Sequence, residues 1–310
     1  MKIKKSLIGA CLSIVALLLA ACGGTNDPLA EAPPQQNGSQ TAAVGEIVVG
    51  SADFTESNIL AEIYAQALRA KGVQTSTKLG IGSREIYIKA LQDQSISIVP
   101  EYTGNLLEHF DANATATTAE EVEAALPRAL PSELKILKSS AAANQDVYVV
   151  TRQNSEQNGV TSLADLEKIA SGATLGGPPE LGTRAYGPAG LEEIYGAKFK
   201  AFKPYAKYPP KISDLDSNKI QVATFFTTDS VLAEKDYVQL EDPQSMILPQ
   251  NVVPLVRSEL AENETVVSAL DAVQAALTTQ DLMALNGKVD NEHQGADQVA
   301  EEWLKSKSLA

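Results

Sequence analysis

The residues best placed to bind a ligand lie in three polar loops that each open a helix. SADFTES (51–57), GIGSRE (80–85) and PEYTGN (100–105) each follow a strand-like stretch and precede a helix-like one. The first turn of a helix presents free backbone N–H groups and a partial positive charge. Three such helix starts at one crevice predict a binding site for a polar or anionic group.

The motifs of the common enzyme classes are missing from the sequence. GIGSRE lacks the third glycine of a dinucleotide fingerprint, and neither a phosphate-loop lysine motif nor a Gly-x-Ser-x-Gly motif occurs. His109 and His293 each stand alone, so neither a triad nor a zinc site is indicated. We therefore expect no catalytic residues, no metal and no cofactor. Two distant carboxylates would suffice for a hydrolase, so an enzyme is unsupported rather than ruled out.

Strand-like and helix-like stretches alternate from Glu46 onwards, which predicts an α/β fold with mainly parallel sheets. We expect strands over 46–51, 75–80, 95–102, 146–151, 173–177, 220–226 and 251–257. We expect helices after Thr55, over 84–93 and through Leu106 and Leu107, and then over 119–130, 162–171, 187–195, 264–277, 279–287 and 295–306. In such sheets the loops at the strand ends form the ligand crevice.

The N-terminal residues predict export and a lipid anchor. A short basic region precedes an apolar run over 7–19, which is too short for a comfortable membrane span and ends at Leu19-Ala20-Ala21-Cys22. This order resembles the bacterial lipoprotein signal, in which the cysteine is acylated and the chain is cut just before it. We expect a signal peptide over 1–21, lipidation of Cys22 and a flexible Gly/Pro/Gln-rich tether over 22–44. An ordinary secretory signal with a stray cysteine is the alternative.

The charge of the chain excludes some partners. Its net charge is −14, and without the first 21 residues, which carry three lysines and no acid, 22 basic residues face 39 acidic ones, a net charge of −17. Such a surface repels phosphate backbones, so a nucleic acid partner is not expected. It also disfavours electrostatic docking to anionic lipid. Attachment to a membrane would have to be covalent.

Three long segments carry a resemblance to a known family. SADFTESNILAEIYAQAL, GIGSREIYIKALQDQSISIVPEYTGNLL and the C-terminal EEWL resemble the substrate-binding proteins of ABC importers for glycine betaine, choline, carnitine and related osmoprotectants. The likeness extends from about Glu46 to Leu309. It implies two α/β lobes of the type II periplasmic-binding-protein fold, with the ligand in the interlobe cleft. By analogy lobe one comprises 45–146 and 228–310, and lobe two comprises 147–227.

The resemblance also implies the chemistry of the site. In the family a box of aromatic rings holds a quaternary ammonium by cation–π attraction, and basic and hydroxyl groups hold a carboxylate. Arg184 in ELGTR matches the carboxylate-binding arginine, and Tyr102 in EYTGN matches a tyrosine of the box. The full set of expected ligand-binding residues is Tyr102, Asn105, Asp146, Tyr148, Arg184, Phe226 and Thr228.

The departures from the family pattern affect the expected ligand. Ala52 stands where the family has a cation, and Ser57 stands where it has Gln. The second-lobe tyrosine of the box would fall near Ile212, which is not aromatic. These changes leave three rings at most and predict weak betaine binding or a different ligand. Tyr205 and Tyr208 either line the cleft or belong to a Pro-rich surface loop.

The sequence as a whole predicts the extracytoplasmic, lipid-anchored binding component of an ABC importer for osmoprotectants. We expect a monomer that passes a small molecule to an ABC permease and catalyses no reaction. One alternative keeps the fold and the transport role but binds an aromatic or sulfur-containing compound. A second alternative is a surface lipoprotein with an enzymatic or adhesive role.

Overall fold

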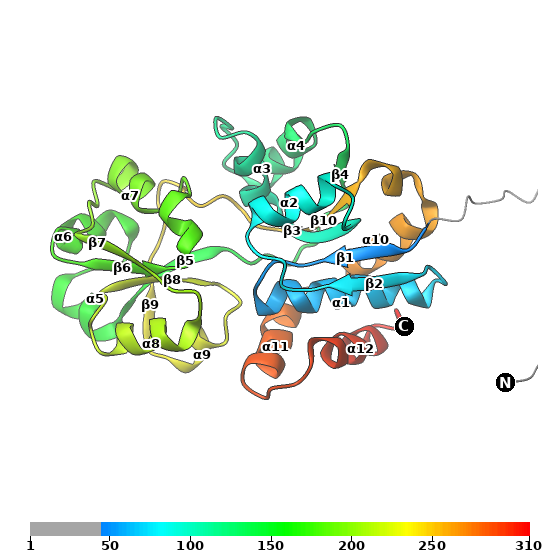
Figure 1. The fold of residues 1–310 in the computed structure, drawn as a ribbon. Coiled ribbons are helices and arrows are strands. Elements are labelled where there is room, and N and C mark those ends of the chain that lie inside the picture. Colours follow the sequence, from blue (N-terminus) through cyan, green and yellow to red (C-terminus); the bar gives the residue numbers. More distant parts are fainter. Residues whose placement is uncertain (1–44) are drawn as a thin grey trace, which may run out of the picture. The chain divides into compact units, whose positions relative to one another are not determined.

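The computed structural model describes residues 45–310 (Figure 1). The predicted signal peptide, the lipidation site Cys22 and the predicted tether over 22–44 lie outside the described residues. Between Val44 and Ala310 the chain forms one compact unit that contains two five-stranded sheets. Each sheet has helices packed on its faces, so the α/β prediction is confirmed.

The first sheet has the strand order β2-β1-β3-β10-β4. Its strands are β1 (Ile47–Gly50), β2 (Thr75–Lys78), β3 (Ile98–Tyr102), β4 (Leu134–Ile136) and β10 (Val252–Arg257). β1 pairs in parallel with β2 and β3, whereas β10 runs antiparallel to β3 and β4. The chain thus leaves this sheet after β4 and returns with β10, which lies between β3 and β4.

The second sheet has the order β7-β6-β8-β5-β9. Its strands are β5 (Asp146–Thr151), β6 (Thr174–Gly177), β7 (Ala201–Pro204), β8 (Val222–Phe226) and β9 (Tyr237–Gln239). β6 pairs in parallel with β7 and β8, and β5 is antiparallel to β8 and β9. Both sheets therefore share one plan, in which three parallel strands are followed by one antiparallel strand, β10 in the first sheet and β5 in the second.

The helices follow the strands in chain order. The α-helices are α1 (Thr55–Ala70), α2 (Arg84–Gln92), α3 (Thr103–Phe110), α4 (Ala119–Ala129), α5 (Arg152–Asn158), α6 (Glu167–Ala170), α7 (Pro188–Tyr195), α8 (Tyr208–Asp216), α9 (Val231–Glu234), α10 (Glu264–Ala276), α11 (Thr279–Asp290) and α12 (Ala296–Ser306). Three short 3₁₀ helices are η1 (Leu163–Leu166), η2 (Pro179–Thr183) and η3 (Ser258–Glu262).

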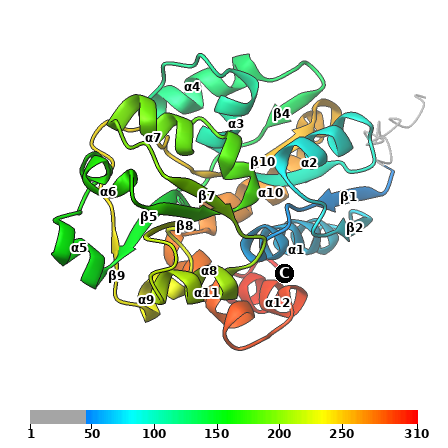
Figure 2. The ribbon, with the colours of Figure 1, turned by 60° about the vertical axis from the view of Figure 1, so that its left-hand side comes forward.

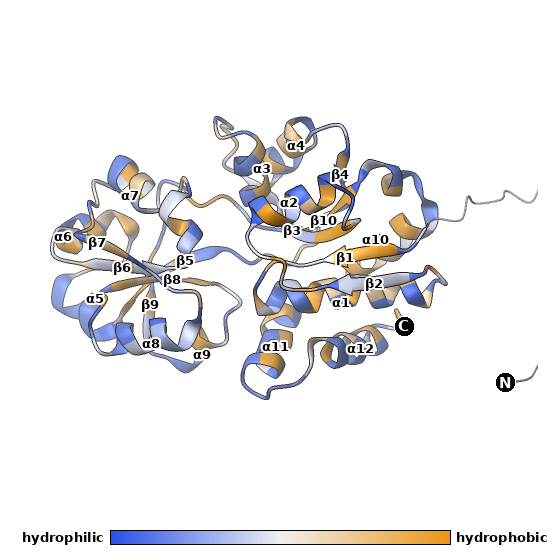
Figure 3. Ribbon diagram, viewed as in Figure 1, coloured by the Kyte–Doolittle hydropathy of each residue, from blue (hydrophilic) through white to orange (hydrophobic). Residues whose placement is uncertain are grey.

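Each face of the first sheet carries its own hydrophobic core. On one face α1, α10, α11 and α12 pack on β1, β3 and β10, and on the other α2, α3 and α4 pack on β3 and β10. Figure 2 shows α11 and α12 beneath α1. Helix α1 fits this place because Ile59, Ile63 and Ala67 recur at helical spacing and are buried. The apolar stripes of the helices and the strand β10 are visible in Figure 3.

The second sheet is also covered on both faces, and β5 shows why. Successive side chains of a strand point to opposite faces. Val147 and Val149 accordingly pack with α8 and α9, whereas Tyr148 and Val150 pack with η1, α6 and α7. Because every one of these side chains is apolar or aromatic, β5 can be buried on both sides.

The structure changes one expected lobe boundary. The sequence predicts that the chain returns to lobe one at Thr228, but β9 pairs with β5 in the second sheet. Leu240, Met246 and Ile247 pack in the same core as Tyr148. The second-sheet part therefore continues to about residue 248. Three residues are too few for a visible strand pattern in the sequence, and the same holds for β4.

A close contact explains why position 104, in the PEYTGN segment, is a glycine. A Cβ at this position would lie 2.6 Å from the backbone oxygen of Pro249 and 2.6 Å from the Cβ of Leu248. The first turn of α3 thus rests directly on the segment that returns from the second sheet. Any side chain would push the helix start away from that segment.

Within residues 45–310, every helix is too short or too polar to cross a membrane.

Candidate functional site

A cleft of about 520 Å³ is lined by residues of both sheet regions. All three predicted loops contribute to it, through Ala52 to Glu56, Gly82 to Arg84, and Tyr102 with Asn105. The starts of α1, α2 and α3 therefore meet at one crevice, as predicted. The opposite wall comes from η2, α8 and the end of β8, with Asn286 and Asp290 of α11 at one side.

Aromatic side chains make up much of the cleft wall. The ring of Phe54 lies 6.2 Å from that of Tyr102 and 5.4 Å from that of Phe226, measured between centroids. We call these three residues the aromatic cluster. The aromatic residues that line the cleft are Phe54, Tyr87, Tyr102, Tyr186, Tyr205, Tyr208, Phe225 and Phe226. The aromatic cluster contains three rings, and the expectation of at most three rings around the ligand stays a prediction.

A buried carboxylate holds the wall of the cleft together. Glu56, in the first turn of α1, accepts hydrogen bonds from Tyr102 Oη (2.7 Å), Asn144 Nδ2 (2.8 Å), Thr228 Oγ1 (2.6 Å) and Asn286 Nδ2 (2.8 Å). These donors come from β3, the segment before β5, the loop after β8, and α11. The carboxylate is 2% exposed, so the four bonds replace its lost hydration.

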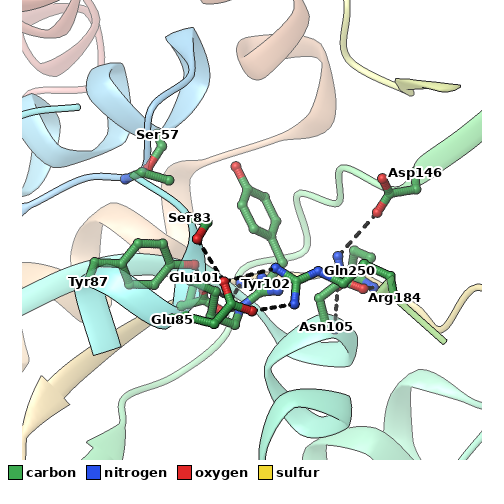
Figure 4. Close-up of polar contacts among 12 residues, drawn as sticks. Ser57, Ser83, Glu85, Tyr87, Glu101, Tyr102, Asn105, Asp146, Arg184 and Gln250 are labelled. Atoms are coloured by element: carbon green, nitrogen blue, oxygen red, sulfur yellow. Dashed lines mark hydrogen bonds and ion pairs between the residues drawn. The ribbon is translucent and has the colours of Figure 1, made fainter. Parts of the chain in front are cut away.

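Each guanidinium in the cleft already has a carboxylate partner (Figure 4). Arg84 Nε lies 3.1 Å from Glu101 Oε2, and this glutamate also accepts a hydrogen bond from Tyr87. Arg184 Nη1 lies 2.5 Å from Glu85 Oε1, which connects η2 of the second-sheet region to α2. Burial works to raise the pKa of Glu85, but hydrogen bonds from Arg184 and Ser83 prevail and lower it to about 2.

Asn105 and Asp146 form a second polar group, which Figure 4 also shows. Asn105 Nδ2 donates to Asp146 Oδ2 (3.1 Å), and Gln250 Nε2 donates to Asn105 Oδ1 (2.7 Å). Burial raises the pKa of Asp146 above its usual range, and the hydrogen bond from Asn105 opposes this rise. A carboxylate that is costly to ionise in isolation attracts a cation that enters the cleft.

The structure places the predicted site residues in two groups. Tyr102, Asn105, Asp146, Arg184 and Phe226 line the cleft, whereas the other two predicted residues lie behind its surface.

Tyr148 and Thr228 are those two residues. Tyr148 is 1% exposed and donates its hydroxyl to the backbone oxygen of Tyr186, so Tyr186 occupies the cleft surface instead. Thr228 is fully buried and bonds Glu56.

Sequence reasoning missed Phe54 and Lys211 and left Tyr208 undecided. Phe54 lies inside the recognised DFTE segment, and its place before a helix start was the available signal. Tyr208 begins α8, and Pro209 and Pro210 occupy the first turn of that helix. Proline is favoured in a first turn because its missing N–H would be unpaired there anyway. A Pro-rich stretch followed by KISDLD was therefore a helix signal as well as a loop signal.

Within residues 45–310, no group of three or more His, Cys, Asp or Glu side chains is arranged to hold a metal ion.

The Glu56 network makes a prediction about stability. Replacing Glu56 by alanine leaves several buried donors without an acceptor, at ~1–3 kcal/mol for each unsatisfied group. We expect the free energy of unfolding to fall by at least about 3 kcal/mol, measured by urea denaturation. Glu120→Ala, an exposed acid in the first turn of α4, is the matched control and should change stability by less than about 1 kcal/mol. Equal effects of the two substitutions would contradict the structural role of Glu56.

Comparisons with known proteins agree with this architecture. Residues 45–306 match the profile of the family described as the substrate binding domain of ABC-type glycine betaine transport systems. The chain is 30% identical over 279 residues to the glycine betaine-binding protein YehZ of Escherichia coli (strain K12), a match that covers 86% of this chain and 92% of that protein. It is 26% identical over 287 residues to the glycine-betaine-binding protein of Pseudomonas aeruginosa, which covers 84% and 88% of the two chains.

A solved structure confirms the predicted type II fold. A crystal structure of a glycine betaine/carnitine/choline ABC transporter protein has a TM-score of 0.68 and 20% identity, and the match covers 85% of this chain and 99% of that one. The strand orders and the interlobe cleft described above belong to this fold. The chain is thus a member of the family of substrate-binding domains of ABC-type glycine betaine transport systems.

Proposed function

We propose that this protein is the extracytoplasmic binding component of an ABC importer for quaternary amines of the glycine betaine, choline and carnitine type. The observation that carries the proposal is the aromatic cluster of Phe54, Tyr102 and Phe226 at an acid-rich cleft. The matched family and the names of the relatives support the same ligand class.

The aromatic cluster suits a trimethylammonium group. A quaternary ammonium donates no strong hydrogen bond, so ring faces and dispersion contacts are what can hold it. Each ring contributes ~0.5–2 kcal/mol to such a contact, most where water is excluded. The hydrogen bond from Tyr102 to Glu56 keeps the Tyr102 ring oriented before a ligand arrives. This preorganisation lowers the entropic cost of binding.

The charges of the cleft favour a cation. Six acidic side chains line it, Asp53, Glu56, Asp146, Glu180, Asp229 and Asp290, against the four basic ones Arg84, Arg184, Lys207 and Lys211. Glu101 and Glu85, which are outside this set, neutralise the two arginines. The excess of negative charge therefore remains available to a cationic ligand.

We propose binding and delivery without catalysis. The lobes would close over the ligand, and the closed form of a monomer would be recognised by a membrane permease. The direct ion pair between Arg184 and Glu85 across the cleft supports this mode of closure, because it joins the two sheet regions at the cleft itself.

The ligand class can be tested with a matched pair of compounds. Choline and its neutral carbon isostere 3,3-dimethylbutan-1-ol have the same shape and differ in charge. We expect the isostere to bind at least about tenfold more weakly in isothermal titration calorimetry, because it gains neither cation–π nor ionic attraction.

Substitutions of Phe54 connect this result to the site. Phe54→Leu keeps apolar contact but removes the ring face, so choline affinity should fall by roughly tenfold while affinity for the isostere hardly changes. Phe54→Tyr, which keeps the ring, is the control. Equal affinity of the wild type for the charged and neutral compounds would contradict the proposed function.

We also propose that Cys22 anchors the protein to the membrane by a lipid. The support is the sequence Leu19-Ala20-Ala21-Cys22 after an apolar run and a basic start. Cys22→Ala should release the protein from the membrane fraction or leave it unprocessed, as judged by fractionation and mass spectrometry. Cys11→Ala, within the predicted signal, is the matched control and should leave anchoring intact. A mature N-terminus other than acylated Cys22 would refute the anchor.

A further inference from the structure

Lys211 is a buried cation in the wall of the cleft. It is 2% exposed, and its Nζ donates a hydrogen bond to the backbone oxygen of Thr224 (2.6 Å). The ammonium lies 4.3 Å from the ring centroid of Tyr208 and 4.1 Å from that of Phe225. These two rings therefore already hold a positive charge that belongs to the protein itself.

Lys211 differs from the arginines of the cleft in its partners. Arg84 and Arg184 each form an ion pair, with Glu101 and Glu85. Among the described residues Lys211 has no ion-pair partner, and the carbonyl of Thr224 is the one acceptor within hydrogen-bond distance of its ammonium. The buried hydroxyl of Thr224 likewise has no hydrogen-bond partner within the described part. A buried ammonium whose donors are incompletely used is a strong site for an anion.

The position of Lys211 orients a zwitterionic ligand. A trimethylammonium group would be repelled from Tyr208 and Phe225, because the lysine ammonium already lies over them. The aromatic cluster around Phe54 carries no such cation. The positive end of the ligand is therefore directed to the cluster, and its negative end is directed towards Lys211.

We propose that Lys211 binds the carboxylate of a zwitterionic ligand and so sets the preference of the cleft for glycine betaine over choline. This inference rests on the proposed function and deepens it. Choline has the same ammonium group but no carboxylate, so it gains nothing from Lys211 and is weakly repelled by it. The lysine thus acts as a specificity determinant.

The protonation of Lys211 supports the proposal. Burial lowers the pKa of this ammonium below its ordinary 10.5, while the carboxylates of Asp229, Asp146 and Glu180 oppose the shift. Burial raises the pKa of Tyr208 well above its ordinary value, so the hydroxyl of that ring stays neutral while the lysine titrates. As the pH rises through the lowered pKa of Lys211, the cation is lost and a carboxylate ligand should bind more weakly.

The test compares two ligands on two variants. Lys211→Met removes the charge and keeps an unbranched side chain that is one heavy atom shorter. We expect its dissociation constant for glycine betaine to rise roughly tenfold to a hundredfold, while that for choline stays unchanged or falls. Lys200→Met, at an exposed lysine of the second-sheet region that does not line the cleft, should alter neither value by more than about threefold. An equal loss for both ligands, or no loss for either, would overturn the assignment and leave the proposed function standing.

A measurement on the wild type keeps the proposal falsifiable if Lys211→Met fails to fold. The dissociation constant for glycine betaine should increase between pH 7 and pH 10 more steeply than that for choline. The choline profile is the control, because it reports the pH effects common to both ligands, including the titration of Asp229. Parallel profiles would refute the role of Lys211. A wild type that binds neither ligand would instead contradict the proposed function, and the inference would fall with it.

Discussion

The buried carboxylate of Glu56 is the interaction on which the cleft depends. Its four donors come from parts of the chain that are far apart in sequence, from Tyr102 to Asn286. A buried charge without partners would be strongly destabilising, so each donor must reach it for the fold to be stable. The same bonds fix the ring of Tyr102 at the cleft surface. Stability of the junction and orientation of the binding surface therefore have one physical cause.

The other charges of the cleft extend this arrangement. The bond from Thr228 to Glu56 ties the end of the second sheet to the first helix, and the Arg184–Glu85 pair adds a direct contact across the cleft. The ion pairs with Glu101 and Glu85 neutralise the charges of Arg84 and Arg184. Within the described residues, the cavity of about 520 Å³ then combines an excess of acidic side chains with the buried ammonium of Lys211. A small zwitterion fits that pattern of charge.

Much of the fold could be predicted because its signals are local. Hydrophobic periodicity located α1, α10 and β10, and strand–helix alternation gave the class. The three loops at helix starts were also placed correctly at one crevice. Short elements such as β9 carry too few residues for a pattern. Together β9 and the packing of the segment up to Ile247 extend the second-sheet part about twenty residues past the predicted boundary at Thr228.

The site was less predictable because its geometry is not local. Whether Tyr148 or Tyr186 reaches the cleft depends on packing, which the spacing along β5 cannot decide. Lys211 could not be distinguished from an ordinary surface lysine, since its burial against Thr224, Tyr208 and Phe225 exists only in the folded chain. Partner choice, such as Glu85 for Arg184, likewise exists only in the folded chain. A family pattern finds matching positions, but residues such as Phe54 and Lys211 emerge from the structure.

A crystal structure of the protein with glycine betaine would test the central claim most directly. The account predicts the ligand in the interlobe cleft, with its trimethylammonium group against Phe54, Tyr102 and Phe226 and its carboxylate directed to the ammonium of Lys211. A ligand outside the cleft would contradict the proposed function. A ligand in the cleft with its carboxylate at Arg184 and its ammonium over Tyr208 would contradict the charge arrangement described here.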